Sequence, residues 1–180
     1  MRRIVLTHGT LAGLVMSAML VAVLPFREQI GFEWGALVGY ASMVAAFLLV
    51  HFGVRAYRDQ VGGGEVSFGR ALGVGALIAL VASVCYVVTW QIVYFGFLPD
   101  FMAEVQAYSL ERMRAGGATA AELAAERAEM ARFAARYRNP AFNAAVTLLE
   151  PLPVGLLVAL VSAIVLRRPR RAAAPLARPA

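Results

Sequence analysis

Residues 55–70, RAYRDQVGGGEVSFGR, form the polar break between two long apolar runs of the chain. The three consecutive glycines at 62–64 are unfavourable inside a helix. We therefore predict that one helix ends at residues 57–59, that the glycines turn the chain, and that Ser67 caps the next helix. The runs on either side are then antiparallel neighbours joined by a tight loop.

The composition excludes an ordinary soluble domain. Hydrophobic residues make up 61% of the 180 residues and charged residues 16%, against roughly 45–50% and about 25% in soluble domains. The net charge of +6 comes from arginine alone, and the arginines flank the apolar runs. This pattern indicates membrane orientation, so we expect the lipid bilayer and no nucleic acid as a partner. The single cysteine, Cys85, excludes an intrachain disulfide and a cysteine-based metal motif.

The apolar runs predict an all-α polytopic membrane protein, because each can cross a hydrocarbon core of about 30 Å. The four expected transmembrane helices lie at residues 4–24, 34–54, 71–97 and 144–166. They form one membrane domain over 1–168, with a short connector at 26–33 and a disordered tail at 169–180. A cleaved signal peptide is the alternative for the first run, although that run is long and no small-residue cleavage site follows it.

The arginines predict the orientation. With the N-terminus inside, the inner side holds Arg2, Arg3, Arg55, Arg58, Arg70 and the five arginines from Arg167 to Arg178. The short outer loop then holds only Arg27, and short loops dominate this rule. Both termini are therefore expected in the cytoplasm.

The segment 99–140 is expected outside the cytoplasm as a helical hairpin broken at Gly116-Gly117. Its second helix opens with Thr119 and Glu122 in the spacing of a capping box. Two interpretations remain open. The hairpin is either a lid or partner-docking element over the bundle, or an amphipathic pair lying on the outer leaflet, which we favour.

Small residues recur at four-residue spacing in all four runs. The sets are Gly9, Gly13 and Ser17; Gly35 and Gly39; Gly69 and Gly73 followed by Gly75, Ala79 and Ser83; and Gly155, Ala159 and Ala163. Such faces allow helices to approach closely in lipid. They predict a compact bundle, or association with a second copy or another membrane protein.

Polar residues within the runs are the candidate functional residues. His8 and His51 are expected at similar depth on the cytoplasmic side, where a pair could bind a metal, ligate haem or relay protons. We favour a hydrogen bond from each ring to the backbone, or snorkelling to the interface. Glu150, before Pro151, could be a proton or cation site, or could pair with Arg27 or with backbone donors at the helix start.

Enzyme signatures are absent from the sequence, including zinc-protease, nucleophile-elbow and phosphate-loop motifs. We therefore expect no catalytic residues, no cofactor and no metal site. Asp59 is expected to pair with Arg58 or Arg55, or to join the glycine turn.

The loop carries a family resemblance. Residues 57–59 (Tyr-Arg-Asp), Gly63-Gly64 and Ser67-Phe68, together with Ala71 and Gly73, resemble the bacterial domain of unknown function 4199 family. The similarity extends over roughly 4–168 and includes Gly39-Tyr40 and the entry to the last run at 150–155. It implies a small four-span protein of the bacterial inner membrane, with no established activity and no catalytic residues to transfer. Gly62 is an extra glycine relative to that pattern.

The leading hypothesis from the sequence is a non-enzymatic integral membrane protein with a structural or accessory role. The alternative is a transporter or proton-coupled component that uses His8, His51 or Glu150. A weaker third hypothesis is an electron carrier with haem on the histidine pair.

Overall fold

The computed structural model of the protein describes residues 1–167 and is almost entirely helical over that range. The helices are α1 (Arg2–Val23), the 3-10 helix η1 (Leu24–Phe26), α2 (Arg27–Gln60), α3 (Phe68–Phe97), α4 (Phe101–Ala115), α5 (Ala120–Tyr137), α6 (Pro140–Leu148) and α7 (Pro151–Leu166). The tail expected at 169–180 lies outside the described residues.

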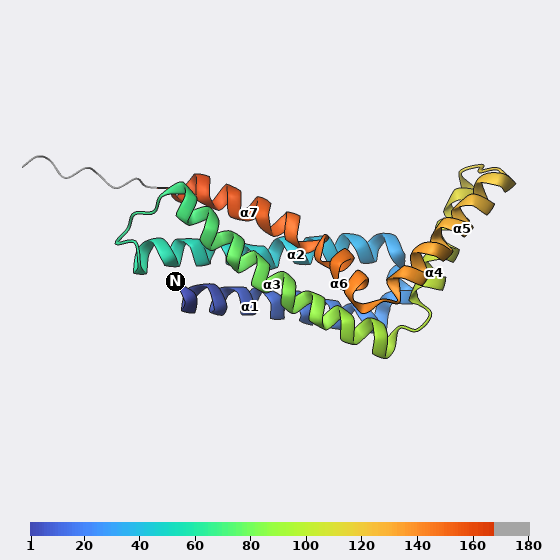
Figure 1. The fold of residues 1–180 in the computed structure, drawn as a ribbon, viewed down its shortest axis with the longest axis horizontal. Coiled ribbons are helices and arrows are strands. Elements are labelled where there is room, and N and C mark those ends of the chain that lie inside the picture. Colours follow the sequence, from blue (N-terminus) through green and yellow to red (C-terminus); the bar gives the residue numbers. More distant parts are fainter. Residues whose placement is uncertain (168–180) are drawn as a thin grey trace, which may run out of the picture.

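Four helical stretches are long and apolar enough to cross a bilayer: 2–26, 29–60, 68–97 and 140–166. At 1.5 Å rise per residue each exceeds a hydrocarbon core of about 30 Å. They lie side by side as an elongated bundle (Figure 1). Apolar side chains such as Leu14, Leu37, Val88 and Leu157 are exposed on its outside, as a lipid-facing surface requires. The predicted all-α polytopic fold is confirmed.

Helix α3 is the centre of the bundle and packs against α1, α2, α6 and α7. A Cβ built on Gly13 of α1 would lie 2.5 Å from the Cβ of Cys85, so the two helices are in backbone-level contact. One turn further, Thr89 donates a hydrogen bond to Ser17 at 2.8 Å. The other face of α3 meets α7, where a Cβ on Gly75 would lie 2.8 Å from that of Ala159.

These contacts confirm close packing for two of the predicted small-residue faces, on α1 and α7, and for the part of α3 from Gly75 onward. The remaining glycines behave differently. Cβ atoms built on Gly35, Gly39, Gly69 and Gly73 would meet nothing within 4 Å. Small residues permit close approach in lipid without enforcing it.

The loop after α2 turns as the glycines predict. Gly63 and Gly64 have φ of 64° and 90°, a region that glycine enters without a Cβ clash. A Cβ on Gly62 would collide with the carbonyl oxygen of Glu65, so the extra glycine is required at its position. Ser67 is the residue preceding α3, but its side chain makes no capping hydrogen bond. The N-terminus, this loop and the end of α7 lie at one end of the bundle (Figure 1), which we call the loop end.

The connector expected at 26–33 is instead helical. Helix α2 begins at Arg27 directly after η1, because Pro25 is tolerated in the first turn of η1 and does not stop the chain from re-entering a helix. The break occurs within α2 at Gly31, whose φ of 71° and ψ of 169° are not helical. The final span is also interrupted, since α6 ends at Leu148 and α7 starts at Pro151.

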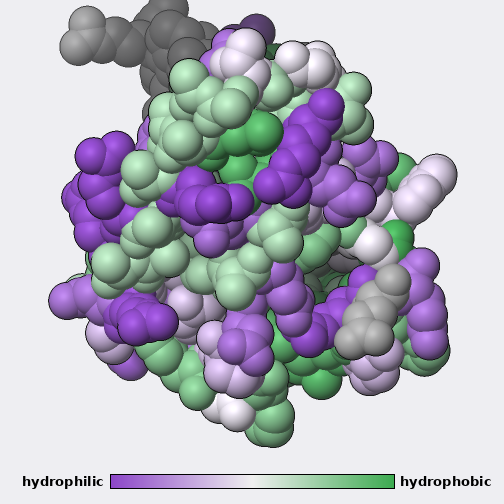
Figure 2. All heavy atoms as spheres, turned by 90° about the vertical axis from the view of Figure 1, so that its right-hand side faces the viewer, coloured by the Kyte–Doolittle hydropathy of each residue, from purple (hydrophilic) through white to green (hydrophobic). Residues whose placement is uncertain are grey.

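Helices α4 and α5 form the predicted hairpin with its turn at Gly116-Gly117, and Gly117 has φ of 83°. Thr119 and Glu122 form the predicted capping box. The pair projects obliquely from the end opposite the loop (Figure 1), which we call the hairpin end. Hydrophilic side chains are numerous over this end, with apolar ones between them (Figure 2). The position of the hairpin relative to a leaflet stays a prediction.

Candidate functional site: a cavity at the hairpin end

A cavity of about 560 Å³ opens between the first half of α2 and helices α1, α3 and α6. It exists because α2 packs less closely here than at the loop end. Gly35 and Gly39 line the cavity, and neither has a neighbour where a side chain would begin. Gly31 changes the direction of α2 at the same wall. The cavity is therefore a consequence of the local path of α2.

The cavity wall is mainly apolar. The lining residues include Met16, Met19, Leu20, Val23, Leu24, Ile30, Ala36, Val38, Met43, Leu98 and Val146. A concave apolar wall with a few convergent polar groups is the usual composition of a small-molecule site in proteins.

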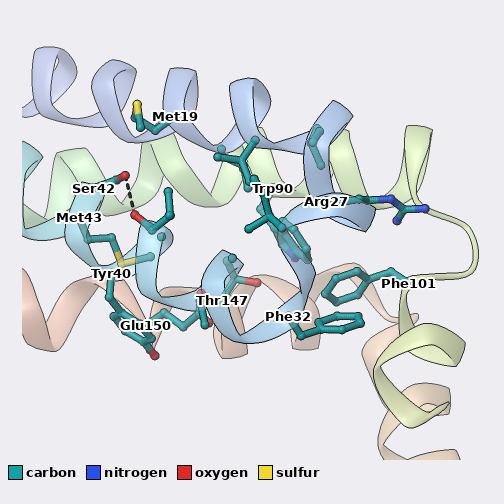
Figure 3. A pocket seen from close by; sticks show the side chains of 18 of the residues that line it. Met19, Arg27, Phe32, Tyr40, Ser42, Met43, Trp90, Phe101, Thr147 and Glu150 are labelled. Atoms are coloured by element: carbon teal, nitrogen blue, oxygen red, sulfur yellow. Dashed lines mark hydrogen bonds between the residues drawn. The ribbon is translucent and has the colours of Figure 1, made fainter. Parts of the chain in front are cut away.

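Glu150 is one of the two carboxyl groups that line the cavity. It lies at the break between α6 and α7, where Pro151 and Pro153 cannot donate backbone hydrogen bonds. Figure 3 shows its side chain beside Tyr40, from the facing part of α2. Among residues 1–167 its carboxylate makes no ion pair and caps no helix.

Arg27 does not pair with Glu150, which corrects one of the sequence-based alternatives. Its Nη2 instead donates to Oε1 of Glu104 in α4 at 3.0 Å, and both side chains are about one-third exposed. Arg27 is the first residue of α2, and it lies at the other end of the cavity from Glu150, within reach of α4. Arg27 and Phe101 lie at the opposite end of the cavity from Glu150 and Tyr40 (Figure 3).

A hydrogen-bond chain forms one side of the cavity and joins three helices. Trp90 Nε1 donates to the Tyr137 hydroxyl at 3.0 Å, and that hydroxyl lies 3.3 Å from the hydroxyl of Thr147. Thr147 in turn donates to Asn143 Oδ1 at 3.5 Å, and Gln91 Nε2 donates to the same oxygen at 2.8 Å. The chain ties α5 and α6 to α3, so the base of the hairpin is part of the cavity wall.

Burial raises the pKa of the Tyr137 phenol above its usual range, although its hydrogen bonds to Thr147 and Trp90 oppose that shift. Tyr137 therefore stays neutral at physiological pH. Tyr137 lies on the same face of α5 as Phe133, whose ring stacks on it with the ring centroids 5.4 Å apart. The partner Asn143, which is fully buried, was missed, because a lone asparagine near a helix start is more often a cap.

The two histidines lie in the loop half of the bundle, and neither lines the cavity. His8 Nδ1 lies 3.0 Å from the carbonyl oxygen of Ile4 in its own helix, the backbone contact that the sequence favours. His51 Nδ1 lies 3.2 Å from the hydroxyl of Ser162 in α7. Within the described residues, no group of three His, Cys, Asp or Glu side chains could hold a metal ion.

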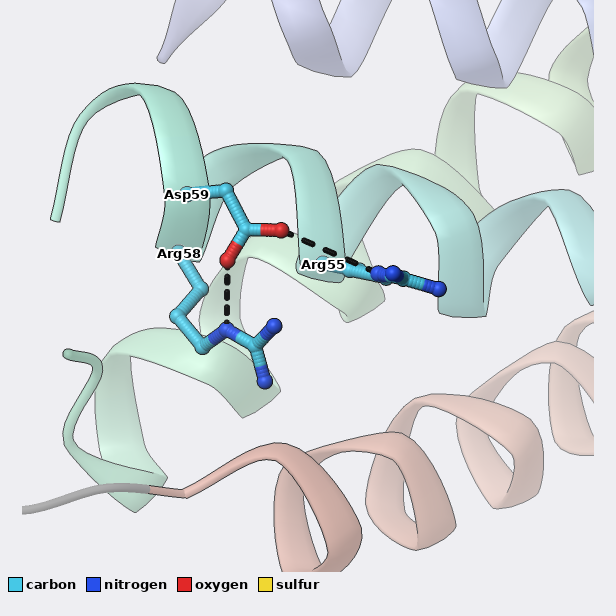
Figure 4. Close-up of polar contacts among 3 residues, drawn as sticks. All are labelled: Arg55, Arg58 and Asp59. Carbon is cyan, nitrogen blue, oxygen red and sulfur yellow. Dashed lines mark hydrogen bonds and ion pairs between the residues drawn. The ribbon is translucent and has the colours of Figure 1, made fainter. Parts of the chain in front are cut away.

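Arg58 and Asp59 are brought together at the loop end, as the sequence predicts. Arg58 Nε donates to Asp59 at 2.7 Å, and Arg55 Nε lies 3.7 Å from the other carboxylate oxygen (Figure 4). The carbonyl of Arg58 also accepts a hydrogen bond from Gly64 at 3.0 Å. The motif thus fixes the end of α2 and the glycine turn together, which is sufficient to explain it structurally.

Comparison with known protein families shows the family of this chain. Residues 7–168 match the family described as Protein of unknown function (DUF4199). The chain belongs to this family. No curated protein and no solved structure matches the chain. Membership in DUF4199 confirms the resemblance seen at the glycine loop, and it assigns no activity to the cavity.

Proposed function

We propose that this DUF4199 protein is a non-enzymatic protein of the bacterial inner membrane that binds an apolar or amphipathic molecule in the cavity at its hairpin end. The observation that carries the proposal is the cavity itself, about 560 Å³ with mainly apolar walls. The walls belong to spans whose outer surfaces are also apolar, so a ligand could enter from the lipid. Binding such a molecule fits the accessory role expected from the sequence.

In the proposed orientation both termini are cytoplasmic and the hairpin lies on the outer side. The arginine distribution supports it, as does the location of the N-terminus, the 61–67 loop and the end of α7 at one end of the bundle. Single cysteines introduced at Val61, which is exposed in the loop, and at Ala118 in a Cys85→Ala background test it. An impermeant maleimide should label position 118 in intact spheroplasts and position 61 only after lysis. The reverse pattern would contradict the orientation.

The binding proposal is tested with a neutral photoreactive probe, a decyl-substituted benzophenone, on the protein in phosphatidylcholine nanodiscs. Met16 and Met43 line the cavity but are only 2% and 6% exposed. A molecule in the surrounding lipid therefore cannot reach them. Peptide mapping by mass spectrometry should find label on these two methionines.

Two matched variants identify where the label enters. Gly39→Trp should fill the cavity and abolish labelling of Met43. Gly73→Trp is the control, because Gly73 is also free of neighbours but lies on an exposed face of α3 away from the cavity. It should leave the labelling unchanged. Labelling confined to lipid-facing side chains in all three proteins would contradict the proposal.

A transporter or proton-coupled component is the second candidate, and the position of Glu150 favours it. Carboxylates within membrane spans mark many proton and cation pathways, and discontinuous spans form many transporter sites. Under this alternative, Glu150→Gln should change a transport phenotype at unchanged protein abundance, whereas a fall in abundance would indicate a structural role. His8 and His51, with structural partners of their own, are weaker candidates. Association with another membrane protein through the unpartnered glycines of α2 and α3 also stays a proposal.

A further inference from the structure

The acidic and basic side chains on the cavity wall are unequal in number. The wall holds one guanidinium, that of Arg27, and two carboxyl groups, those of Glu104 and Glu150. Arg27 and Glu104 form an ion pair and neutralise each other. Glu150 has no ion-pair partner among residues 1–167. The carboxyl group of Glu150 is therefore left without an opposite charge among the described residues, and it lies at the other end of the cavity from the pair (Figure 3).

A carboxyl group in a low-dielectric site is either protonated or ionised beside a compensating cation, so a cationic ligand would stabilise its ionised form. Arg27 does not require an anionic ligand, for two reasons. The guanidinium already holds a carboxylate at 3.0 Å. Its buried Nη1, which has no partner among the described residues, needs only a hydrogen-bond acceptor, and a neutral oxygen supplies that as well as an anion does.

Aromatic rings line both ends of the cavity. Tyr40 lies beside Glu150 (Figure 3), and Tyr86 also lines the cavity, whereas Trp90 and Phe101, with ring centroids 5.2 Å apart, lie toward the Arg27 end. The faces of aromatic rings attract cations, and the attraction is larger where water is excluded. Rings of this kind also accept the apolar body of a ligand.

We infer that the cavity is selective for lipophilic cations, molecules that carry an amine, quaternary ammonium or similar charge on an apolar frame. The charge would lie at the Glu150 carboxylate and the apolar frame against the methionines and rings of the wall. This inference rests on the proposed function, because it requires that the cavity binds an apolar molecule at all.

The test compares two ions of the same four-ring shape and opposite charge, tetraphenylphosphonium and tetraphenylborate. Each competes with the neutral benzophenone probe for labelling of Met43 in phosphatidylcholine nanodiscs. Concentrations are corrected for partition of each ion into protein-free nanodiscs. Tetraphenylphosphonium should compete at a concentration at least tenfold lower than tetraphenylborate, and equal or stronger competition by the anion would overturn the inference.

Glu150→Gln should reduce this ratio to about one while the neutral probe still labels Met43, which shows that the cavity is intact. The control is Glu129→Gln, which removes an exposed carboxylate of α5 outside the cavity and should keep the ratio. A preference for the cation that survives Glu150→Gln would overturn the assignment to Glu150. Neutral labelling without discrimination between the ions would contradict this inference and leave the proposed function standing. Loss of all labelling of the wild-type protein would contradict both.

Discussion

Small residues at four-residue spacing give opposite results in two parts of the bundle, the contact of α7 with α3 and the first half of α2. In the half that includes the loop end, Gly155 of α7 lies so close to α3 and α2 that a Cβ would be 2.7 Å from that of Ala79 and 2.8 Å from a ring carbon of Phe47. In the half at the hairpin end, Gly35 and Gly39 of α2 face open volume. A small-residue face in a span therefore indicates either a helix contact or the wall of a cavity, and the neighbouring helix decides which.

The largest expected effect comes from adding a side chain in the closely packed half. Gly155→Leu should lower the free energy of unfolding by about 3 kcal/mol or more, because backbone and ring atoms would have to move. Gly39→Leu is the matched variant in the open half and should change stability by less than about 1 kcal/mol. Unfolding in mixed micelles, followed by circular dichroism, measures both. Equal losses would show that the two halves are packed alike.

The hydrogen-bond chain beside the cavity is expected to stabilise the open half. Tyr137→Phe removes the acceptor of Trp90 and the partner of Thr147, and it should cost about 1–2 kcal/mol, since buried groups lose their hydrogen bonds. The loss should appear as faster amide exchange in α5 and α6, with the contact of α3 and α7 unaffected. Faster exchange throughout the bundle would mean that the chain is part of the global core instead.

The same tyrosine predicts a dependence on alkaline pH. Because burial raises its pKa in the folded protein, its contribution to stability is complete below the pKa of an unfolded tyrosine, about 10. The contribution is lost as the pH rises from that value through the raised pKa. The protection factors of the α5 amides in the wild-type protein, which compare each rate with the intrinsic rate at the same pH, should therefore fall above about pH 10. In Tyr137→Phe that part of the pH dependence should be missing.

The smallest effect is expected in the hairpin itself, which projects from the open half. Thr119→Ala removes the side-chain cap of α5 and should destabilise that helix by about 1 kcal/mol. Hydrogen bonds from the Thr119 backbone and side chain lower the pKa of Glu122, so the capping interaction is present at neutral pH and is lost as the pH falls through that lowered value. Hydrogen exchange should change only within α5. A change at α3 would show that the hairpin and the bundle fold as one unit.

The spans, the glycine turn and the capping box could be read from the sequence because each depends on residues near one another in the chain. Apolar length predicts a span, and a Thr119–Glu122 spacing predicts a cap whatever lies around it. The prediction of a non-helical connector at 26–33 was wrong because it also rested on local residues alone. Arg27 to Gln29 are polar and follow Pro25, yet they continue as helix.

The cavity could not be predicted, because it depends on how far α2 stands from α6. The hydrogen-bond chain beside it joins residues far apart in the sequence, with Trp90 and Tyr137 separated by 47 positions and Gln91 and Asn143 by 52. No local pattern fixes such a pairing. The sequence did identify Glu150 as a candidate, since a carboxylate next to two prolines in an apolar run is unusual. It could not show that Arg27 would pair with Glu104 instead.

At Gly31 there is free space for a side chain, but the backbone conformation does not suit one. A methyl group added there would touch nothing within 4 Å, yet the φ of 71° excludes L-amino acids with a side chain. By mirror symmetry a D-alanine would adopt this backbone as comfortably as an L-alanine adopts an extended one. The backbone at this wall of the cavity therefore depends on the chirality of residue 31 and not on the size of its side chain. A semisynthetic protein with D-alanine at position 31 should keep the cavity open, whereas an L-residue at that position should distort it.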